Sequence, residues 1–175
     1  MVLLADAAKG IVWRVDTYTG AYSVVIQNDV FLPTNPLIPL GVDGVHILRN
    51  ELYFTNLGNN LLGVVQISAN GTAIGALQNI SNQLAFPDDF AVTDNGTVYV
   101  VGDNTLWRVT PNGGVDVLAG GAQDLALEGA TSAQFGRTKD DAGVLYVGTN
   151  GGLLAAVDGV LHGGQLLAVN VGLYR

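Results

Sequence analysis

Cysteine is absent from the 175 residues of this sequence, which excludes disulfide bonds, thiolate nucleophiles and zinc–thiolate sites. Basic residues are also scarce: seven Lys and Arg stand against fifteen Asp and Glu, and the formal net charge is -8. These few cations are scattered along the chain, whereas a nucleic-acid surface needs clustered cations that displace counterions from phosphates. The sequence therefore argues against a nucleic-acid partner.

Long apolar runs are missing as well. No window approaches the roughly 18 uninterrupted apolar residues of a membrane-spanning helix. The first apolar run ends at Asp6 and is too short for the core of a signal peptide. We therefore expect no membrane partner and no secretion signal in this chain.

Three glycosylation sequons leave the localisation open. They begin at Asn70, Asn79 and Asn95, and they are compatible with secretion of a longer parent protein. Asn70 and Asn95 are each followed by Gly, so both have an alternative interpretation as turn residues.

Apolar residues and glycine are abundant. The sequence is 49% hydrophobic and only 13% charged, and it contains 24 glycines. This composition is typical of short buried strands joined by tight turns. We expect one all-β domain covering residues 1–175.

An internal repeat is the strongest pattern. Four apolar runs begin at Val2, Leu52, Val98 and Leu145, about 47 residues apart, which is the period of a four-stranded propeller blade. A turn and a second strand follow each run, over 11–16, 61–65, 106–110 and 153–158, and then another turn. A short strand precedes three of the runs, over 41–47, 86–92 and 130–135, and in a propeller it would line the central channel.

The repeat predicts about three and a half to four antiparallel β-propeller blades. Their approximate bounds are 1–30 (incomplete), 41–80, 86–120 and 128–175. Because a propeller closes its ring to hide strand edges, this number predicts an incomplete ring. Missing N-terminal blades of a longer protein or another copy of the chain would complete it, or the edges stay open. A solenoid is the alternative arrangement.

Three segments of the sequence carry a family resemblance: residues 4–16, 41–46 and 129–138. They are similar to the SMP-30/gluconolactonase/LRE-like superfamily, especially its fungal members. The resemblance covers nearly the whole chain. It implies a propeller of about six blades, of which this chain would be the C-terminal part.

The same resemblance implies a divalent cation, often calcium, at the channel mouth. Asp88, in Pro87-Asp88-Asp89, matches one family ligand, and Asp43, in Val42-Asp43-Gly44, stands where the family has Asn. The family's first-blade Glu has no counterpart here. Two carboxylates supply only part of the roughly six to eight oxygens that calcium takes, and Asp is also favoured in turns for its own backbone hydrogen bonds.

Three further residues on the expected inner strands are candidates for catalysis. His46 can serve as a general acid or base because imidazole titrates near neutral pH, or it is a packing residue. Thr131 and Ser132 would point to opposite faces of their strand, so only one of them can face a ligand. Neither has the base partner that an activated nucleophile requires. His162, beside Gly163-Gly164, is expected in a turn.

Three functions follow, and the first two have a small molecule as ligand at the channel mouth. One is a metal-dependent hydrolase of lactones or esters, in which the cation polarises the carbonyl. Another is a metal-independent pericyclase, similar to hetero-Diels-Alderases of fungal natural-product biosynthesis, which needs a shaped apolar pocket. The third is a non-catalytic propeller fragment that binds a partner or assembles with itself.

Overall fold

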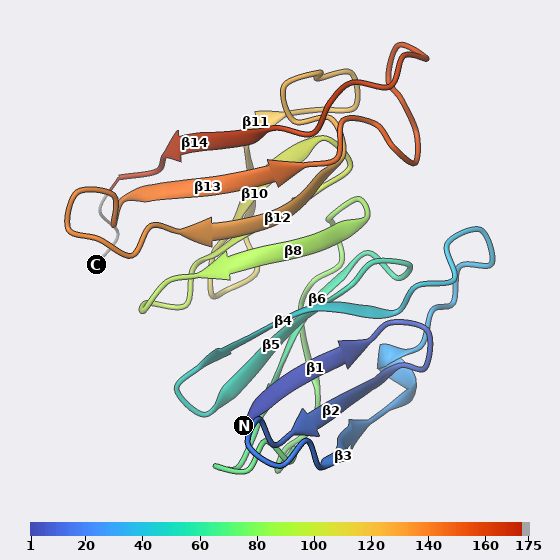
Figure 1. Cartoon of the computed structure of the whole chain (residues 1–175), viewed down its shortest axis with the longest axis vertical. Helices are drawn as coiled ribbons and strands as arrows, with labels where there is room; N and C mark the ends of the chain where they lie inside the picture. Colours follow the sequence, from blue (N-terminus) through green and yellow to red (C-terminus); the bar gives the residue numbers. More distant parts are fainter. Residues whose placement is uncertain (173–175) are drawn as a thin grey trace. The chain divides into compact units, whose positions relative to one another are not determined.

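The computed structural model describes residues 1–172 and contains four antiparallel sheets of three or four strands each (Figure 1). The chain forms two compact units, residues 1–86 and 87–175. The predicted all-β class with propeller-type blades is confirmed. Within the described part, no helix is long and apolar enough to cross a membrane.

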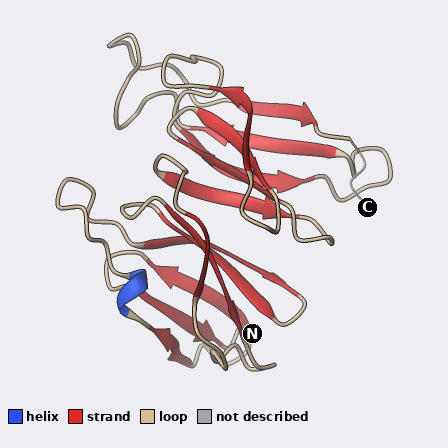
Figure 2. Ribbon diagram, turned by 180° about the vertical axis from the view of Figure 1, so that it is seen from behind, coloured by secondary structure: helices blue, strands red, loops and turns tan. Residues whose placement is uncertain are grey.

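Unit 1 contains two sheets. The first has the order β1-β2-β3, and the second has the order β4-β5-β6-β7. A short 3-10 turn, η1, precedes the second sheet and is the blue segment in Figure 2. The bounds are β1 Val2–Asp6, β2 Ile11–Val15, β3 Tyr22–Gln27, η1 Asp29–Phe31, β4 Val42–Leu48, β5 Glu51–Asn56, β6 Leu61–Gln66 and β7 Gln78–Ser81.

Unit 2 also contains two sheets, with the orders β8-β9-β10-β11 and β12-β13-β14. Strand β12 packs against β8 and β9, so the innermost strands of the two sheets are neighbours. The bounds are β8 Pro87–Val92, β9 Val98–Gly102, β10 Thr105–Val109, β11 Val115–Gly120, β12 Ala130–Phe135, β13 Val144–Thr149 and β14 Leu166–Asn170.

The three predicted inner strands are confirmed as β4, β8 and β12, but the strand predicted over 153–158 is wrong. Those residues lie in the β13–β14 loop, residues 150–165, and Leu166–Asn170 pairs with β13 instead. The reason is local: Gly151 and Gly152 take positive φ values of 66° and 81°, which turn the chain away from the sheet directly after β13.

One turn recurs three times and fixes the hairpin ends. The hydroxyls of Ser68, Thr93 and Thr110 each lie within hydrogen-bond distance of two acceptors, the side-chain oxygen of an Asn two residues later and the backbone carbonyl four residues later, and the single hydroxyl proton is donated to one of them or shared between them. The residue that directly follows the Asn is Gly71, Gly96 or Gly113, and each of these glycines has a positive φ. Two of the sequon asparagines, Asn70 and Asn95, therefore serve as turn residues, as their alternative interpretation expected.

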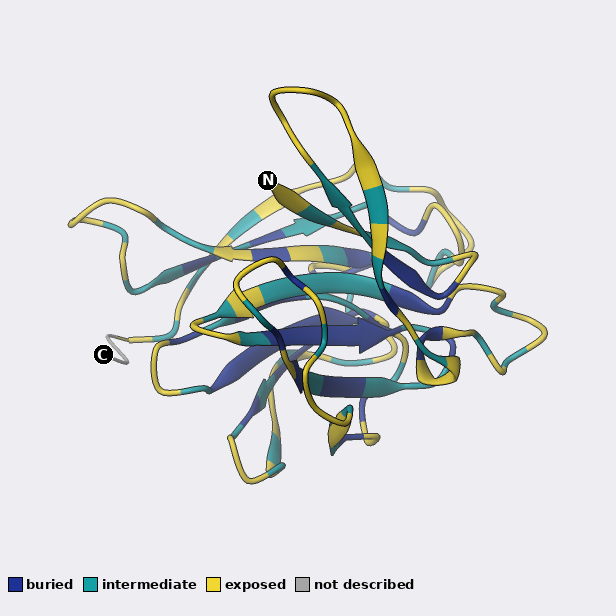
Figure 3. Cartoon of the chain, turned by 90° about the horizontal axis from the view of Figure 1, so that it is seen from below, coloured by how far each residue is buried: buried dark blue, intermediate teal, exposed yellow. Residues whose placement is uncertain are grey.

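Each unit has its own apolar core, which Figure 3 shows as dark blue segments along the strands. In unit 1, Phe54 and Phe31 are fully buried and meet edge to face with ring centroids 4.8 Å apart. A side chain at Gly63 would overlap the Phe54 ring, so the glycine makes room for it. In unit 2, Tyr99 and Leu145 belong to one buried cluster that spans both sheets. These cores hold the inner strands in place.

Candidate functional site

The three complete inner strands share a bulge in their first half. Each inner strand pairs residue by residue with the next strand of its sheet. Between the first and the second of these residue pairs, the inner strand has one residue more than its partner. The inserted segments contain Asp43 in β4, Asp88 in β8 and Thr131 in β12. Bulges re-aim side chains and are frequent beside active sites. The repeat therefore places a carboxylate, a carboxylate and a hydroxyl at equivalent positions of three blades.

The bulge of β4 is held by a buried hydroxyl. Val42 pairs with Asn56 and Val45 with Phe54, so Asp43 and Gly44 both lie opposite Thr55. The Gly44 N–H donates to Thr55 Oγ1 at 2.9 Å, and Thr55 is fully buried. Asp43 itself is half-buried.

The neighbouring Asn56 fixes the end of β5 beside this bulge. Its side-chain amide donates to the carbonyls of Val30 and Leu32 at 2.9 and 3.2 Å. These two bonds tie the chain that leads into β4 to the same end of the sheet, so the backbone around Asp43 is anchored on both sides.

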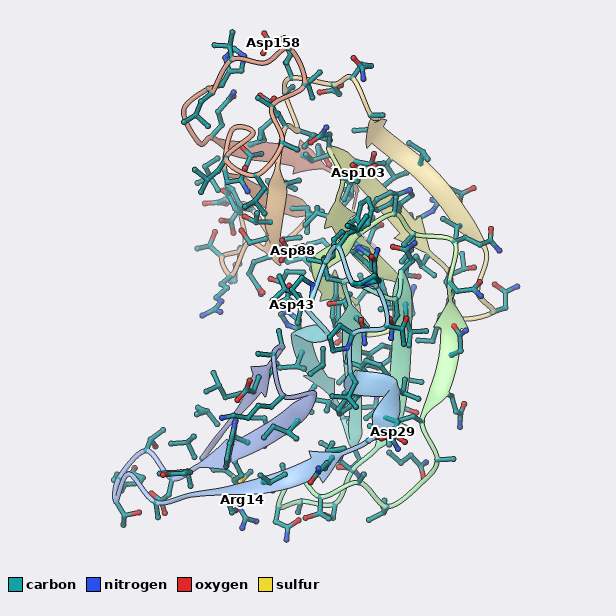
Figure 4. All side chains as sticks on the ribbon, turned by 90° about the vertical axis from the view of Figure 1, so that its right-hand side faces the viewer. Arg14, Asp29, Asp43, Asp88, Asp103 and Asp158 are labelled. Carbon is teal, nitrogen blue, oxygen red and sulfur yellow. The ribbon has the colours of Figure 1, made fainter. Side chains whose placement is uncertain are left out.

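The bulge of β8 carries two acidic residues. Pro87 pairs with Gly102 and Phe90 with Val100, which leaves Asp88 and Asp89 opposite a single residue, and both are half-buried. Proline suits the first position of a strand because it has no N–H to donate to the sheet. Figure 4 labels Asp43 and Asp88, each on the inner strand of its own unit.

Asp103 is a further acidic residue at the Asp88 end of its sheet. It follows Gly102, the partner of Pro87, in a tight β9–β10 turn with φ 40°. Its side chain keeps contact with solvent, yet partial burial raises the pKa of its carboxyl above the ordinary range.

The bulge of β12 lies between Ala130, paired with Thr149, and Ser132, paired with Gly148. Thr131 is half-buried and Ser132 is exposed. A Cβ at Gly148 would lie 2.5 Å from Ser132 Oγ, so glycine provides the room for this hydroxyl. Thr131 and Ser132 stay candidates for contact with a ligand.

His46 lies on β4 three residues after Asp43, pairs with Tyr53 and is half-buried. His162, expected in a turn, lies in the β13–β14 loop within a group of acidic side chains. Its Nε2 is 3.2 Å from Asp158 Oδ2 and 4.0 Å from Glu128 Oε2. The hydrogen bond from the Val160 backbone N–H, followed by that from His162, lowers the pKa of Asp158.

Sequence reasoning missed Glu128, which is 1% exposed and directly precedes β12. The available signal was its place between the apolar Leu127 and the Gly129-Ala130 that begins an inner strand. A charged residue in such a run is expected only where a specific partner holds it.

Carboxylates on these bulges have the oxygen chemistry that a hard divalent cation prefers. Among residues 1–172, however, no three His, Asp or Glu side chains are grouped closely enough to hold a metal ion. Asp43 and Asp88 therefore stay candidate ligands, and a complete coordination shell at either one needs further oxygens.

No protein-family model matches the chain. Two curated proteins are similar in sequence, both named putative hetero-Diels-Alderases. The protein from Sarocladium schorii is 30% identical over 155 residues, which is 79% of this chain and 39% of that protein. The protein from a Phoma species is 28% identical over 162 residues, which is 88% of this chain and 46% of that protein. The chain thus spans less than half the length of either relative.

Solved propeller structures resemble the chain in fold. Luciferin-regenerating enzyme superposes with a TM-score of 0.65 at 15% identity, over 94% of this chain and 52% of that one. A gluconolactonase from Xanthomonas campestris gives 0.56 at 11% identity, over 78% and 40%. Regucalcin, a calcium-binding protein from Agrobacterium tumefaciens, gives 0.55 at 17% identity, over 82% and 45%. All three belong to the superfamily that the sequence resembles.

Proposed function

We propose that this chain, which has the blade fold of the SMP-30/gluconolactonase/LRE-like superfamily, is part of a metal-assisted hydrolase that opens a small lactone or ester. The observation that carries the proposal is the shared bulge, which puts Asp43 and Asp88 at equivalent positions of two inner strands. The fold neighbours named as a gluconolactonase and as calcium-binding regucalcin support it.

The chemistry divides between the cation and the chain's own side chains. A bound divalent cation polarises the ester carbonyl and favours attack by water. As candidate ligands, Asp43 and Asp88 would each offer negatively charged oxygens from the inner strand of its own unit. His46, on the same strand as Asp43, is the candidate general acid or base, and the Thr131 hydroxyl is a candidate hydrogen-bond partner for the substrate.

The test is hydrolysis of glucono-δ-lactone by the full chain, followed as acid release with and without calcium. We expect Asp43→Asn and Asp88→Asn each to lower the calcium-dependent rate at least about tenfold, because each removes a charged ligand. Asp29→Asn, a matched charge removal on η1, should retain the rate. A rate that is unaffected by EDTA and by both bulge variants would refute the hydrolase.

A metal-independent pericyclase is the second candidate, and the two sequence relatives specifically favour it. Such an enzyme binds a reactive diene and alkene in one orientation and needs no cation. Cycloaddition of a heterodiene with an alkene, faster and more stereoselective than the background reaction and undiminished by EDTA, would support this candidate. Loss of that activity on chelation would contradict it.

A further inference from the structure

The β13–β14 loop lies at the end of the sheet where β12 begins (Figure 1). It is unusual because several of its apolar side chains are exposed. Leu153, Leu154, Val160 and Leu161 have exposed fractions of 67%, 88%, 55% and 62%. Surface loops are normally polar, and exposed apolar groups gathered on one segment are typical of a ligand or partner contact. The loop is therefore a candidate for a mobile segment that closes over a ligand or a partner.

Two glycine pairs delimit the loop. Gly151-Gly152 begins it and Gly163-Gly164 ends it. A Cβ at Gly151 would overlap the carbonyl of His162, and one at Gly164 would lie 2.6 Å from the carbonyl of Thr149. The two ends consequently lie against each other, and glycine, which lacks a Cβ, gives the backbone a wider range of conformations at both ends, as hinges require.

Hydrogen bonds at the base join the loop to the residues before β12. The Gly151 N–H donates to the Glu128 carbonyl at 3.1 Å, and the Asn150 N–H donates to the Gly129 carbonyl at 2.8 Å. The His162 N–H donates to the Gly151 carbonyl at 3.0 Å, which closes the loop on itself. The base is thus fixed to the sheet while the segment 153–161 extends beyond it.

One buried side chain holds the middle of the loop. Glu128 Oε1 accepts a 2.6 Å hydrogen bond from the Val157 N–H. Gly152 is required for this contact, because a Cβ there would lie 2.7 Å from the same oxygen. Carboxylate–amide bonds of this length are strong, so Glu128 acts as a latch between the sheet and the loop.

The other oxygen of this carboxylate suggests that the closed loop is one of two states. Among the described residues, Glu128 Oε2 has no hydrogen-bond partner although it is buried, and His162 Nε2 is 4.0 Å away. Native proteins rarely leave a buried charged oxygen without a donor when its only task is structural. Opening the loop would expose this oxygen and separate it from the His162 imidazole, which is already partly exposed.

We propose that residues 151–164 form a lid that is latched by Glu128 and hinged at its two glycine pairs, and that it controls access to the end of unit 2 that carries Thr131 and Asp88. The lid's apolar side chains suit the carbon skeleton of a small molecule, and Glu128 Oε2 suits a hydroxyl or other donor on it. Only this ligand assignment rests on the proposed function.

Hydrogen exchange of the full chain without ligand tests the lid. In Glu128→Ala, amides of residues 152–161 should exchange at least about tenfold faster, while those of β12 and β13 keep their protection. Val157→Pro removes the N–H donor and leaves the buried carboxylate in place, so it should free the same segment. Asp116→Ala, which removes an exposed carboxylate paired with Arg108 at 2.7 Å, is the control and should change nothing in the loop.

Two results would overturn the lid. One is faster exchange throughout β12, β13 and β14 in Glu128→Ala with no effect of Val157→Pro, which would make Glu128 a support of the core. The other is unchanged exchange of the loop in both variants. The hydrogen-exchange experiment uses no substrate. Its result therefore tests the lid even if the hydrolase and pericyclase assays both fail.

Discussion

Two glycines of unit 1 allow backbone strain and steric clash, the two costs of adding a side chain, to be measured separately. Gly10 and Gly20 both have positive φ, 64° and 72°. A Cβ at Gly20 would meet nothing within 4 Å, whereas one at Gly10 would lie 2.8 Å from Leu32 Cδ2 and 2.9 Å from Leu32 N. The first position therefore isolates backbone strain, and the second adds a steric clash.

We predict that Gly20→Ala lowers the free energy of unfolding by about 1 kcal/mol and that Gly10→Ala lowers it by about 2–4 kcal/mol. Urea denaturation followed by tryptophan fluorescence measures both. Equal losses for the two variants would mean that the contact with Leu32 does not constrain Gly10.

The Asp141 carboxyl links stability to pH. Hydrogen bonds from the Thr138 hydroxyl and backbone N–H, at 2.7 Å each, lower the pKa of Asp141 below its ordinary range. The deprotonated form is thus favoured by folding, so its contribution is complete above the ordinary Asp pKa and is lost as the pH falls through the lowered folded-state pKa.

Asp141→Asn should therefore reduce the unfolding temperature at pH 7, and the difference from wild type should disappear under strongly acidic conditions. Thermal unfolding followed by circular dichroism from pH 7 down to pH 2 would measure it. A difference that stays constant with pH would show that the Thr138 bonds do not depend on the charge of Asp141.

The positions of Asp43 and Asp88 in the fold were predictable from the sequence. Both were expected on inner strands, and both lie on the bulges of β4 and β8. Their role as cation ligands stays a prediction. The burial of Glu128 was not predicted, because it depends on the loop of residues 150–165, which folds back and contacts this side chain. A long-range contact of this kind leaves no local periodicity.

At the scale of elements, the Thr55 hydroxyl is one of the groups that hold the bulge of β4. Replacing Thr55 by Val keeps the shape of the side chain and removes the acceptor for the Gly44 N–H. We predict a loss of about 1–2 kcal/mol of unfolding free energy and faster exchange of the Gly44 amide, because a buried donor is left unpaired.

Amide exchange measured by NMR on Thr55→Val checks this directly. Ser23→Ala is a suitable control, since it removes a hydroxyl that accepts from Arg14 at 3.1 Å on β3, away from the bulge. Unchanged protection of Gly44 in Thr55→Val would show that the bulge is held by the backbone alone.

Elements were predictable where two signals agreed. For β4, β8 and β12, the position before a repeated apolar run and the blade spacing indicated the same strand, and the structure has it. In the last blade the apolar run 153–158 resembled a strand, but the glycines before it turn the chain and β14 takes the pairing. The positive φ values at Gly151 and Gly152 therefore prevented the apolar run 153–158 from pairing with β13.

At the scale of the molecule, two sheets have three strands within the described residues. The sheet β1-β2-β3 has no strand inside β1, and the sheet β12-β13-β14 has none outside β14. Free strand edges favour pairing with another segment. Ring completion by further blades of a longer protein or by another copy stays a prediction, which light scattering during size exclusion would test.

We propose that Asp43 and Asp88 are cation ligands at equivalent positions of their blades. Titration of the full chain with Mn²⁺ tests it most directly, because the paramagnetic ion broadens the NMR signals of nearby amides even when binding is weak. We predict that the amides of residues 43–44 and 88–89 broaden first, and that Asp43→Asn and Asp88→Asn each suppress the effect at their own bulge. Broadening that begins at other acidic turns and spares both bulges would contradict the account.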